Sequence, residues 1–309
     1  MKLSTKIKSI VLVIALLAAL ASVFVGCIPA KLEKIVGTYK LITDTNQKYE
    51  QETVDRIETY GIESYLVITG NDYGYYVYKD NYSSVTCKEV SLSYAKNDDD
   101  EITSVTYSTG VSTDQHSFNV NAQKEGTFLV ARWPSASKLI DAFEKQFKKV
   151  SDATDLSYVK TLYPDMPVYP YATYIYDGMY YAEIATPNTN FADYIYKFYD
   201  VDVPGGSATC YYALKADKTP ITERNLPLTF IRNESTSKPE TMKIGEISFA
   251  LENESPVREL TIPIQDVNAD VKEYLYQFYD PDVNPDDGYE AYFLGLIEEY
   301  ENSLQEKAE

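Results

Sequence analysis

Oxygen-bearing side chains alternate with other residues near the C-terminal end of the chain, in a segment that reads DPDVNPDDG. Asp280, Asp282, Asn284 and Asp286 would present an oxygen at every second position, and carboxylate and amide oxygens are the ligands that Ca²⁺ prefers. Pro285 stands where such a loop needs a glycine, and no Glu follows at the twelfth position. The segment predicts a weak calcium site, and the alternative is an acidic loop before a C-terminal helix.

The residue types that nucleophilic chemistry needs are scarce, because the chain has one histidine and three cysteines. Asp114, His116 and Ser117 have the residue types of a catalytic triad, but neighbours in sequence do not form one. Cys87 and Cys210 either form a disulfide or remain as two free thiols. Strand alternation points one thiol outward and the other inward, which favours two free thiols. No catalytic residue is predicted.

Acidic residues dominate the charge of the chain: 47 Asp and Glu face 28 Lys and Arg, for a net charge of -19 and a pI near 4.5. Nucleic acid is excluded as a partner, because phosphate binding needs a basic surface. A glycosidase-type hydrolase would need two carboxyl groups about 5–9 Å apart. Because the chain has 47 acidic residues, the sequence does not single out any one pair as catalytic. A carboxylate-based hydrolase is therefore the least favoured alternative to a non-enzymatic protein.

Tyrosine is unusually frequent, with 30 residues in a chain of 309. Tyr73, Tyr75, Tyr76 and Tyr78 fall within one predicted strand and occupy both of its faces. A tyrosine ring has a flat apolar face and a polar tip, so exposed clusters suit sugar rings or peptides. These four residues are candidate ligand-binding residues. The alternative is that Tyr replaces Phe in thin, partly hydrated strands.

The first residues have the layout of an export signal. Three lysines, at positions 2, 6 and 8, precede an apolar stretch from Ile10 to Val25. The stretch ends in Phe24-Val-Gly-Cys27, which resembles the lipobox of bacterial lipoproteins, although that family usually carries Leu at the position of Phe24. The resemblance implies cleavage before Cys27 and a diacylglyceryl group on its sulfur. The alternative is an ordinary signal peptide that contains a cysteine.

Lipidation of Cys27 would place the protein outside the cytoplasm, anchored to the cell membrane and facing the cell surface, with acyl chains of the palmitate type. Two acyl chains hold a protein on a membrane stably, whereas one binds reversibly. Loss of residues 1–26 removes three lysines, so the net charge changes from -19 to -22. The membrane is therefore the predicted partner through the lipid, while the acidic body is repelled by anionic headgroups.

Short antiparallel strands are predicted through most of the first half, since apolar residues alternate between turn-rich segments. These strands cover residues 35–42, 64–69, 73–79, 86–94, 102–107, 117–121 and 127–132. Helical spacing predicts a short helix over 53–61 and a longer one over 137–150, where Phe143 and Phe147 belong to an apolar stripe.

Gly37-Thr-Tyr39 at the start of the first strand resembles the Gly-x-Trp/Tyr signature that opens lipocalin-like barrels. The strand series and the helix after it agree with that family, and the resemblance covers residues 35 to about 150. It implies a closed or nearly closed barrel that either holds one small apolar ligand or is filled by side chains.

The second half begins after a segment rich in Pro and Tyr. Asp177-Gly178 predicts a type I′ turn and hence a hairpin over 173–184. The segments FADYIYKFYDVDV at 191–203 and VKEYLYQFYDPDV at 271–283 form a repeat, and their helical spacing predicts two short packing helices. Residues 288–305 are predicted to form a docking helix. Gly178-Met-Tyr180 would match Gly37-Thr-Tyr39 if the second half is a divergent copy of the first.

These observations predict an α+β, β-rich protein, with a lipocalin-like antiparallel barrel followed by a second antiparallel-sheet domain with short packing helices. The predicted function is that of a lipoprotein that binds a small apolar ligand or a cell-envelope component, without a cofactor apart from the weak calcium site. The alternative is a glycan- or peptide-binding module that uses exposed tyrosines. The expected segments are a signal peptide (1–26), a lipidated tether (27–34), the barrel domain with its C-terminal helix (35–155), a linker (156–171) and the second domain (172–309).

Overall fold

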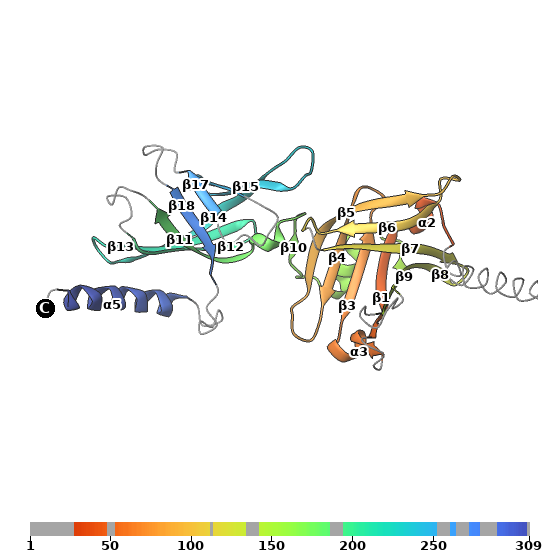
Figure 1. The fold of residues 1–309 in the computed structure, drawn as a ribbon, viewed down its shortest axis with the longest axis horizontal. Coiled ribbons are helices and arrows are strands. Elements are labelled where there is room, and N and C mark those ends of the chain that lie inside the picture. The colour runs from red at the N-terminus through yellow and green to blue at the C-terminus, as the bar shows by residue number, and fades with distance from the viewer. Residues whose placement is uncertain are drawn as a thin grey trace, which may run out of the picture. The chain divides into compact units, whose positions relative to one another are not determined.

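A computed structural model describes residues 28–47, 53–111, 114–133, 142–185, 194–251, 260–263, 272–278 and 289–307. The chain divides into two compact units (Figure 1). The first consists of Met1–Ser108 and Gln115–Met166, and the second of Thr109–Asp114 and Pro167–Glu309. Both are built of antiparallel strands, so the predicted β-rich fold class with an antiparallel barrel is confirmed. No helix in the described part of the chain is long and apolar enough to cross a bilayer.

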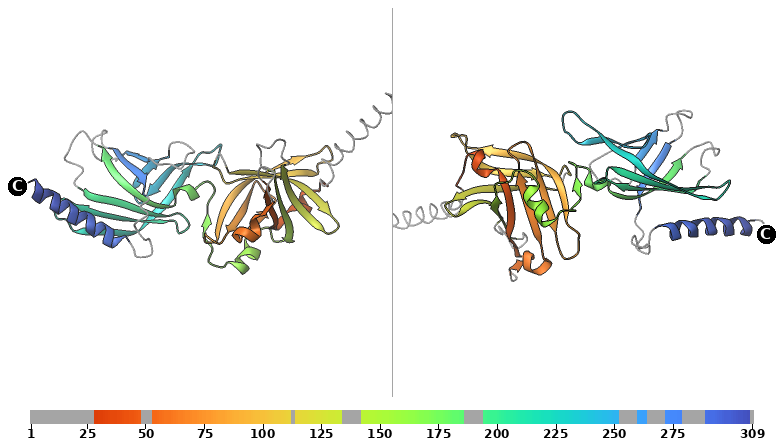
Figure 2. Two further views of the ribbon diagram at one scale, coloured as in Figure 1. Left: turned by 60° about the horizontal axis from the view of Figure 1, so that its bottom comes forward. Right: turned by 180° about the vertical axis from the view of Figure 1, so that it is seen from behind.

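Eight antiparallel strands form the body of the first unit within the described ranges (Figure 2). Each pairs with the next in chain order, and the last pairs back with the first, so the hydrogen-bonded ladder runs in a closed circle. This is the up-and-down order of a small barrel. The strands are β1 (Gly37–Gln47), β3 (Glu63–Ile68), β4 (Tyr73–Lys79), β5 (Thr86–Lys96), β6 (Ile102–Ser108), β7 (Gln115–Gln123), β8 (Gly126–Trp133) and β9 (Ala142–Ser151).

Tyr39 anchors the end of the barrel at which β1 begins. Its ring is fully buried, and its hydroxyl donates a hydrogen bond of 2.6 Å to the carbonyl of Ile35, the last residue of α2 (Leu32–Ile35). Gly37 has a φ of +136°, and a Cβ there would lie 2.5 Å from the carbonyl oxygen of Ser151. Only glycine fits this position. The Gly-x-Tyr segment therefore closes one end of the barrel by turning α2 back onto the buried residues inside it. These residues, which include Leu41, Leu66 and Phe147, are called the interior cluster.

The helix predicted over 137–150 is wrong, because residues 142–151 form β9 between β1 and β8. Phe143 and Phe147 are four residues apart, and this spacing puts them on one face of a helix and equally on one face of a strand. Phe147 is buried opposite Leu41 and Leu129, so the pairing that closes the barrel favours the strand over the helix. The short helix predicted over 53–61 is confirmed as α3 (Arg56–Tyr60), after the two-residue strand β2 (Val54–Asp55).

A helix does follow the strands, but it is α4 (Ser157–Leu162), within the segment predicted as a linker. It carries the buried Val159 and covers the outer face of the barrel, where the ring of Tyr158 lies 6.4 Å from that of Tyr65. Cys87 is fully buried on the same outer face. Cys87 and Cys210 do not form a disulfide with each other, so the alternative with two separate thiols is the one observed.

The burial of Cys87 makes its reactivity testable. Burial raises the pKa of this thiol to about 12, and the positive charge of Lys160 opposes part of that increase. The reactive thiolate is therefore scarce until the pH approaches that value, and at pH 8 we expect alkylation of native Cys87 to be slower than in unfolded protein by on the order of a thousandfold. Mass spectrometry of iodoacetamide-treated protein measures this rate. An exposed thiol introduced on the same strand by Ser93→Cys is the control, and equal labelling of both positions would contradict the prediction.

Among the residues described in the second unit, eight strands, β11 to β18, form a closed barrel. Before β11 lie the two-residue strand β10 (Val168–Tyr169) and the single-turn helix η1 (Tyr174–Tyr176). The C-terminal docking helix is confirmed as α5 (Glu290–Glu306). The barrel strands are β11 (Gly178–Ala185), β12 (Tyr194–Asp202), β13 (Ser207–Leu214), β14 (Pro220–Arg232), β15 (Pro239–Ile244), β16 (Ile247–Ala250), β17 (Leu260–Pro263) and β18 (Lys272–Gln277).

The hairpin predicted over 173–184 is wrong, because its first half forms η1 rather than a strand. A type I′ turn needs positive φ at both central residues, but Asp177 is extended at φ -77° and only Gly178 is positive, at 113°. The carboxylate of Asp177 instead accepts hydrogen bonds from the Val203 N–H and the Tyr169 hydroxyl. These bonds hold Asp177 at the start of β11.

The two packing helices predicted from the repeat are also wrong, since the repeated segments contribute β12 and β18, which flank β11 on either side. β12 is apolar on both faces: Tyr199 packs inside the barrel, whereas Tyr196 and Phe198 pack against Phe293 of α5. A strand covered on both faces reads as a continuous apolar run, which also satisfies helical spacing. The outer aromatic residues of the repeat in β12 are therefore buried by helix α5, and not by forming packing helices themselves.

Candidate functional site

A cavity of about 460 Å³ opens at the end of the first barrel opposite Tyr39. It is formed by the last part of β1, the start of β7, the facing parts of β8 and β9, and the first residue of α3, and it reaches the interior cluster at Phe118 and Ala131. Most of the lining side chains are polar. The lining residues are Asp44, Thr45, Asn46, Arg56, Gln115, His116, Ser117, Phe118, Ala131, Phe143 and Lys145.

An irregularity in β1 brings Asp44 onto the inner face of the barrel. Leu41 pairs with Phe147, but the register shifts before Thr43, and Asp44 then pairs with Lys145. Phe147 and Lys145 share one face of β9, so Asp44 shares the inner face with Leu41 although they are three residues apart. After the bulge, the inner face of β1 therefore carries the charged Asp44, whereas before it the same face carries the apolar Leu41.

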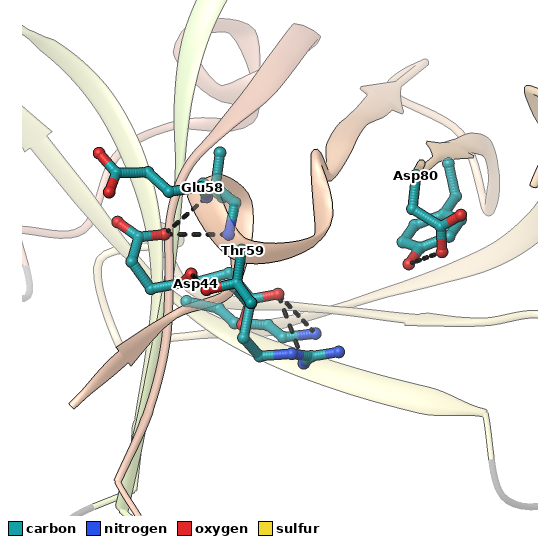
Figure 3. A network of polar contacts seen from close by, with 9 residues as sticks. Asp44, Glu58, Thr59 and Asp80 are labelled. Carbon is teal, nitrogen blue, oxygen red and sulfur yellow. Dashed lines mark hydrogen bonds and ion pairs between the residues drawn. The ribbon is translucent and has the colours of Figure 1, made fainter. Parts of the chain in front are cut away.

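The carboxylate of Asp44 is the centre of a small charge network (Figure 3). Its Oδ2 lies 3.5 Å from Nη1 of Arg56 and 3.9 Å from Nζ of Lys145, and its side chain is only 4% exposed. Arg56 opens α3, whose N-terminus is capped by the Asp55 carboxylate at 2.9 Å from the Ile57 N–H. The cap sets where α3 begins and hence where the Arg56 guanidinium stands at the cavity.

Two buried acceptor atoms at the cavity have no hydrogen-bond partner among the described residues. They are Oδ1 of Asp44 and Oδ1 of Asn46. Asn46 lies two residues after Asp44, on the same face of β1. A buried acceptor without a donor costs about 1–3 kcal/mol, so native structures rarely keep one without a reason. These atoms mark the polar wall of the cavity as the place where a bound molecule would gain most.

Stacked rings form the opposite, aromatic side of the site. Phe118 stacks on Tyr107 at 6.1 Å between ring centroids, and Tyr107 stacks on Tyr76 at 5.0 Å. The imidazole of His116 lies 5.1 Å from the Tyr107 ring. The stack continues from Tyr76 to Tyr78 at 6.5 Å. Because these rings contact one another, the stack fixes the position of His116 and of the buried Phe118 where they line the cavity.

The structure divides the four candidate tyrosines between the two faces of β4. Tyr76 and Tyr78 point into the barrel, where burial, together with a hydrogen bond of 2.9 Å to Asp80, raises the pKa of Tyr78 to about 12. Tyr73 and Tyr75 lie on the outer face with ring centroids 6.2 Å apart. The four therefore do not form one binding surface, although the inner pair belongs to the stack behind the cavity.

Other predicted site residues lie outside the described residues. These are Cys27 and the calcium candidates Asp280, Asp282, Asn284 and Asp286. In the part of the chain that the structure describes, no group of three or more His, Cys, Asp or Glu residues is arranged to hold a metal ion.

Sequence reasoning missed Asp44, Arg56 and Lys145. The first strand was expected to end at residue 42, and Lys145 was assigned to a helix, so neither residue could be placed on the inner face of a barrel. Simple alternation from Tyr39 would have pointed Thr43 inward, and only the bulge turns Asp44 to the interior. No motif marks these three residues.

A comparison of the chain with protein-family models, with curated proteins and with solved structures finds no match. The geometry of the cavity therefore carries the functional argument.

Proposed function

We propose that this protein is a membrane-anchored, extracytoplasmic lipoprotein that binds a small molecule in the cavity of its first barrel, without catalysis. The cavity of about 460 Å³ at the open end of the barrel carries the proposal. Its volume falls within the range of about 300–1,000 Å³ that is usual for small-molecule sites. Buried side chains fill the rest of the barrel interior, so the cavity at this end is the space in the barrel that a ligand would occupy.

The lining favours an amphipathic ligand over a purely apolar one. Phe118 and Ala131 lead to the apolar interior, whereas Asp44, Arg56 and Lys145 surround the polar wall. An apolar portion of the ligand would lie against Phe118, and a polar portion would face the charge network. Such a division, with a few placed polar groups that orient the ligand, is typical of binding pockets.

Binding is favoured over hydrolysis by the distribution of acids. Asp44 is the one carboxylate among the described residues that line the cavity, and it is paired with two cations. The two-carboxylate mechanism of a glycosidase needs a second acid within about 5–9 Å across the bound substrate. The anchor is supported by the N-terminal lysines, the apolar stretch from Ile10 to Val25 and the lipobox-like segment that ends at Cys27.

A neutral fluorescent probe tests the cavity as a binding site. We expect the soluble chain from Ile28 onward to bind N-phenyl-1-naphthylamine, and Ala131→Phe to weaken this binding by at least about tenfold, because the new ring fills space next to Phe118. Fluorescence titration measures both affinities. Ala95→Phe introduces the same ring at an exposed position on β5 and should bind the probe as the wild type does. Equal binding by the wild type and Ala131→Phe would refute the proposal.

A further inference from the structure

We propose that the cavity takes a neutral polyhydroxyl ring, that is, one sugar unit of a glycan or a free saccharide. The inference rests on the proposed function and names the ligand class of the same site. Four properties of the described residues carry it: two buried acceptors without donors, two cations with donors to spare, a flat aromatic wall, and the acidity of the chain.

The acceptors require a ligand that donates hydrogen bonds. Oδ1 of Asp44 is buried, and neither it nor Oδ1 of Asn46 has a hydrogen-bond partner within the described ranges. A hydrocarbon would cover these atoms and leave them without donors, at a cost of about 1–3 kcal/mol each. Hydroxyl groups donate to carboxylate and amide oxygens. Both positions share one face of β1, so adjacent hydroxyls on one ring would satisfy both once each side chain turns its oxygen toward the cavity.

The two cations offer hydrogen-bond donors to the same ligand. Nη1 of Arg56 and Nζ of Lys145 stand 3.5 Å and 3.9 Å from Oδ2 of Asp44, which is longer than a usual N–H···O hydrogen bond of 2.7–3.2 Å. An arginine has five N–H donors and a lysine three, so both retain donors for a ligand. A hydroxyl donates and accepts at once, so a vicinal pair can bridge from the carboxylate to a cation.

The charge balance argues against the ionic alternatives. A cationic ligand would satisfy Asp44 but would stand beside Arg56 and Lys145, and like charges in a partly buried site repel. An anionic ligand would pair with the cations, but it would face Asp44 and approach a chain of net charge -19. A neutral ligand with hydroxyl groups meets neither repulsion.

The aromatic wall suits the apolar face of a ring. Phe143, which is 38% exposed, and His116 line the cavity, while Phe118 is only 2% exposed and lies beneath them in its stack on Tyr107. The C–H face of a sugar ring packs against flat aromatic surfaces, while its hydroxyl rim points sideways. The polar wall of β1 and the aromatic side of the cavity therefore match the two surfaces of one sugar unit.

Displacement of the bound probe tests this inference with a panel of neutral saccharides: glucose, galactose, mannose, N-acetylglucosamine, cellobiose and lactose. We expect at least one of them to displace N-phenyl-1-naphthylamine from the wild-type chain. Saturation-transfer NMR then identifies the ring face in contact with the protein.

Variants of the polar wall decide which atoms recognise the saccharide. Asp44→Asn and Asn46→Ala should each weaken saccharide binding by about tenfold or more, because each removes an acceptor oxygen. Asn46→Ala leaves the three charges of the network in place, so it remains informative if Asp44→Asn folds poorly. Asn119→Ala, at an exposed position of β7, is the matched control and should bind as the wild type does.

The outcomes separate the two proposals. Probe binding that Ala131→Phe abolishes, with displacement by palmitate and by no saccharide, would keep the cavity as a binding site and overturn the sugar assignment. Displacement by glucuronate alone would also overturn it in favour of an anionic class. Saccharide affinity unchanged in Asp44→Asn and Asn46→Ala would refute the assigned atoms and the inference with them. Absence of probe and saccharide binding by the wild type would refute both proposals.

Discussion

Replacement of Tyr39 by alanine should lower the free energy of unfolding of the first barrel by about 3–5 kcal/mol, the usual cost of deleting a large buried aromatic side chain. The ring is 0% exposed in the interior cluster, and its hydroxyl holds the carbonyl of Ile35 at 2.6 Å. The substitution therefore leaves a void where β1 begins and releases the contact with α2. Because domains typically retain about 5–15 kcal/mol, a loss of this size can unfold the barrel at physiological temperature.

Calorimetry or circular dichroism of the soluble chain measures the effect. Tyr39→Phe keeps the ring and removes only the hydrogen bond, so it should cost about 1 kcal/mol and serves as the control. The second barrel has its own core around Tyr180, so its unfolding transition should stay at the wild-type temperature. A first transition that does not move in Tyr39→Ala would show that the Gly-x-Tyr segment does not support the closed end of the barrel.

Replacement of Cys27 by serine should abolish incorporation of a fatty-acid analogue and release the protein from the membrane. A thioether to diacylglyceryl needs the sulfur, and no other part of the lipobox-like segment can take its place. Each buried methylene contributes about 0.8 kcal/mol to membrane binding, so loss of two acyl chains removes most of the affinity. The acidic body adds none, since it is repelled by anionic headgroups.

Metabolic labelling of cells, followed by separation of membrane and soluble fractions, measures both effects. Phe24→Leu restores the residue that is usual in the lipobox and should retain the label and the membrane association. Unchanged labelling of Cys27→Ser would remove the lipid site, and the chain would then be anchored by another means or exported by an ordinary signal. Cavity binding is measured on the soluble chain, so its outcome is independent of this one.

Alternation of apolar residues was sufficient to predict seven of the eight strands of the first barrel, all except β9. Tyr73–Lys79 was predicted with its observed bounds, and the other early strands were found within a few residues. These strands have one face inside the barrel and turn residues at both ends, so the local pattern and the final environment agree. The Gly-x-Tyr segment was also informative, since the backbone at Gly37 admits no side chain.

Helical spacing misled in two strands, and in one of them both faces are covered. Tyr194–Asp202 packs inside the second barrel with one face and under α5 with the other. Ala142–Ser151 closes the first barrel between β1 and β8. In both segments the apolar residues satisfy the period of a helix as well as that of a strand, and distant partners decided the outcome. Those partners lie far away along the chain, so the residues near each segment do not reveal them.

The sequence by itself determined the β-rich class, most strands of the first barrel and the scarcity of catalytic residue types, because each depends on composition or on neighbours along the chain. The tertiary structure decided that both halves are eight-stranded barrels and that one of them opens into a cavity. It also decided the site, because Asp44, Arg56 and Lys145 come from three elements and meet only after a bulge turns β1. Which face a side chain takes depends on register, and register is set by pairing between strands that are far apart in sequence.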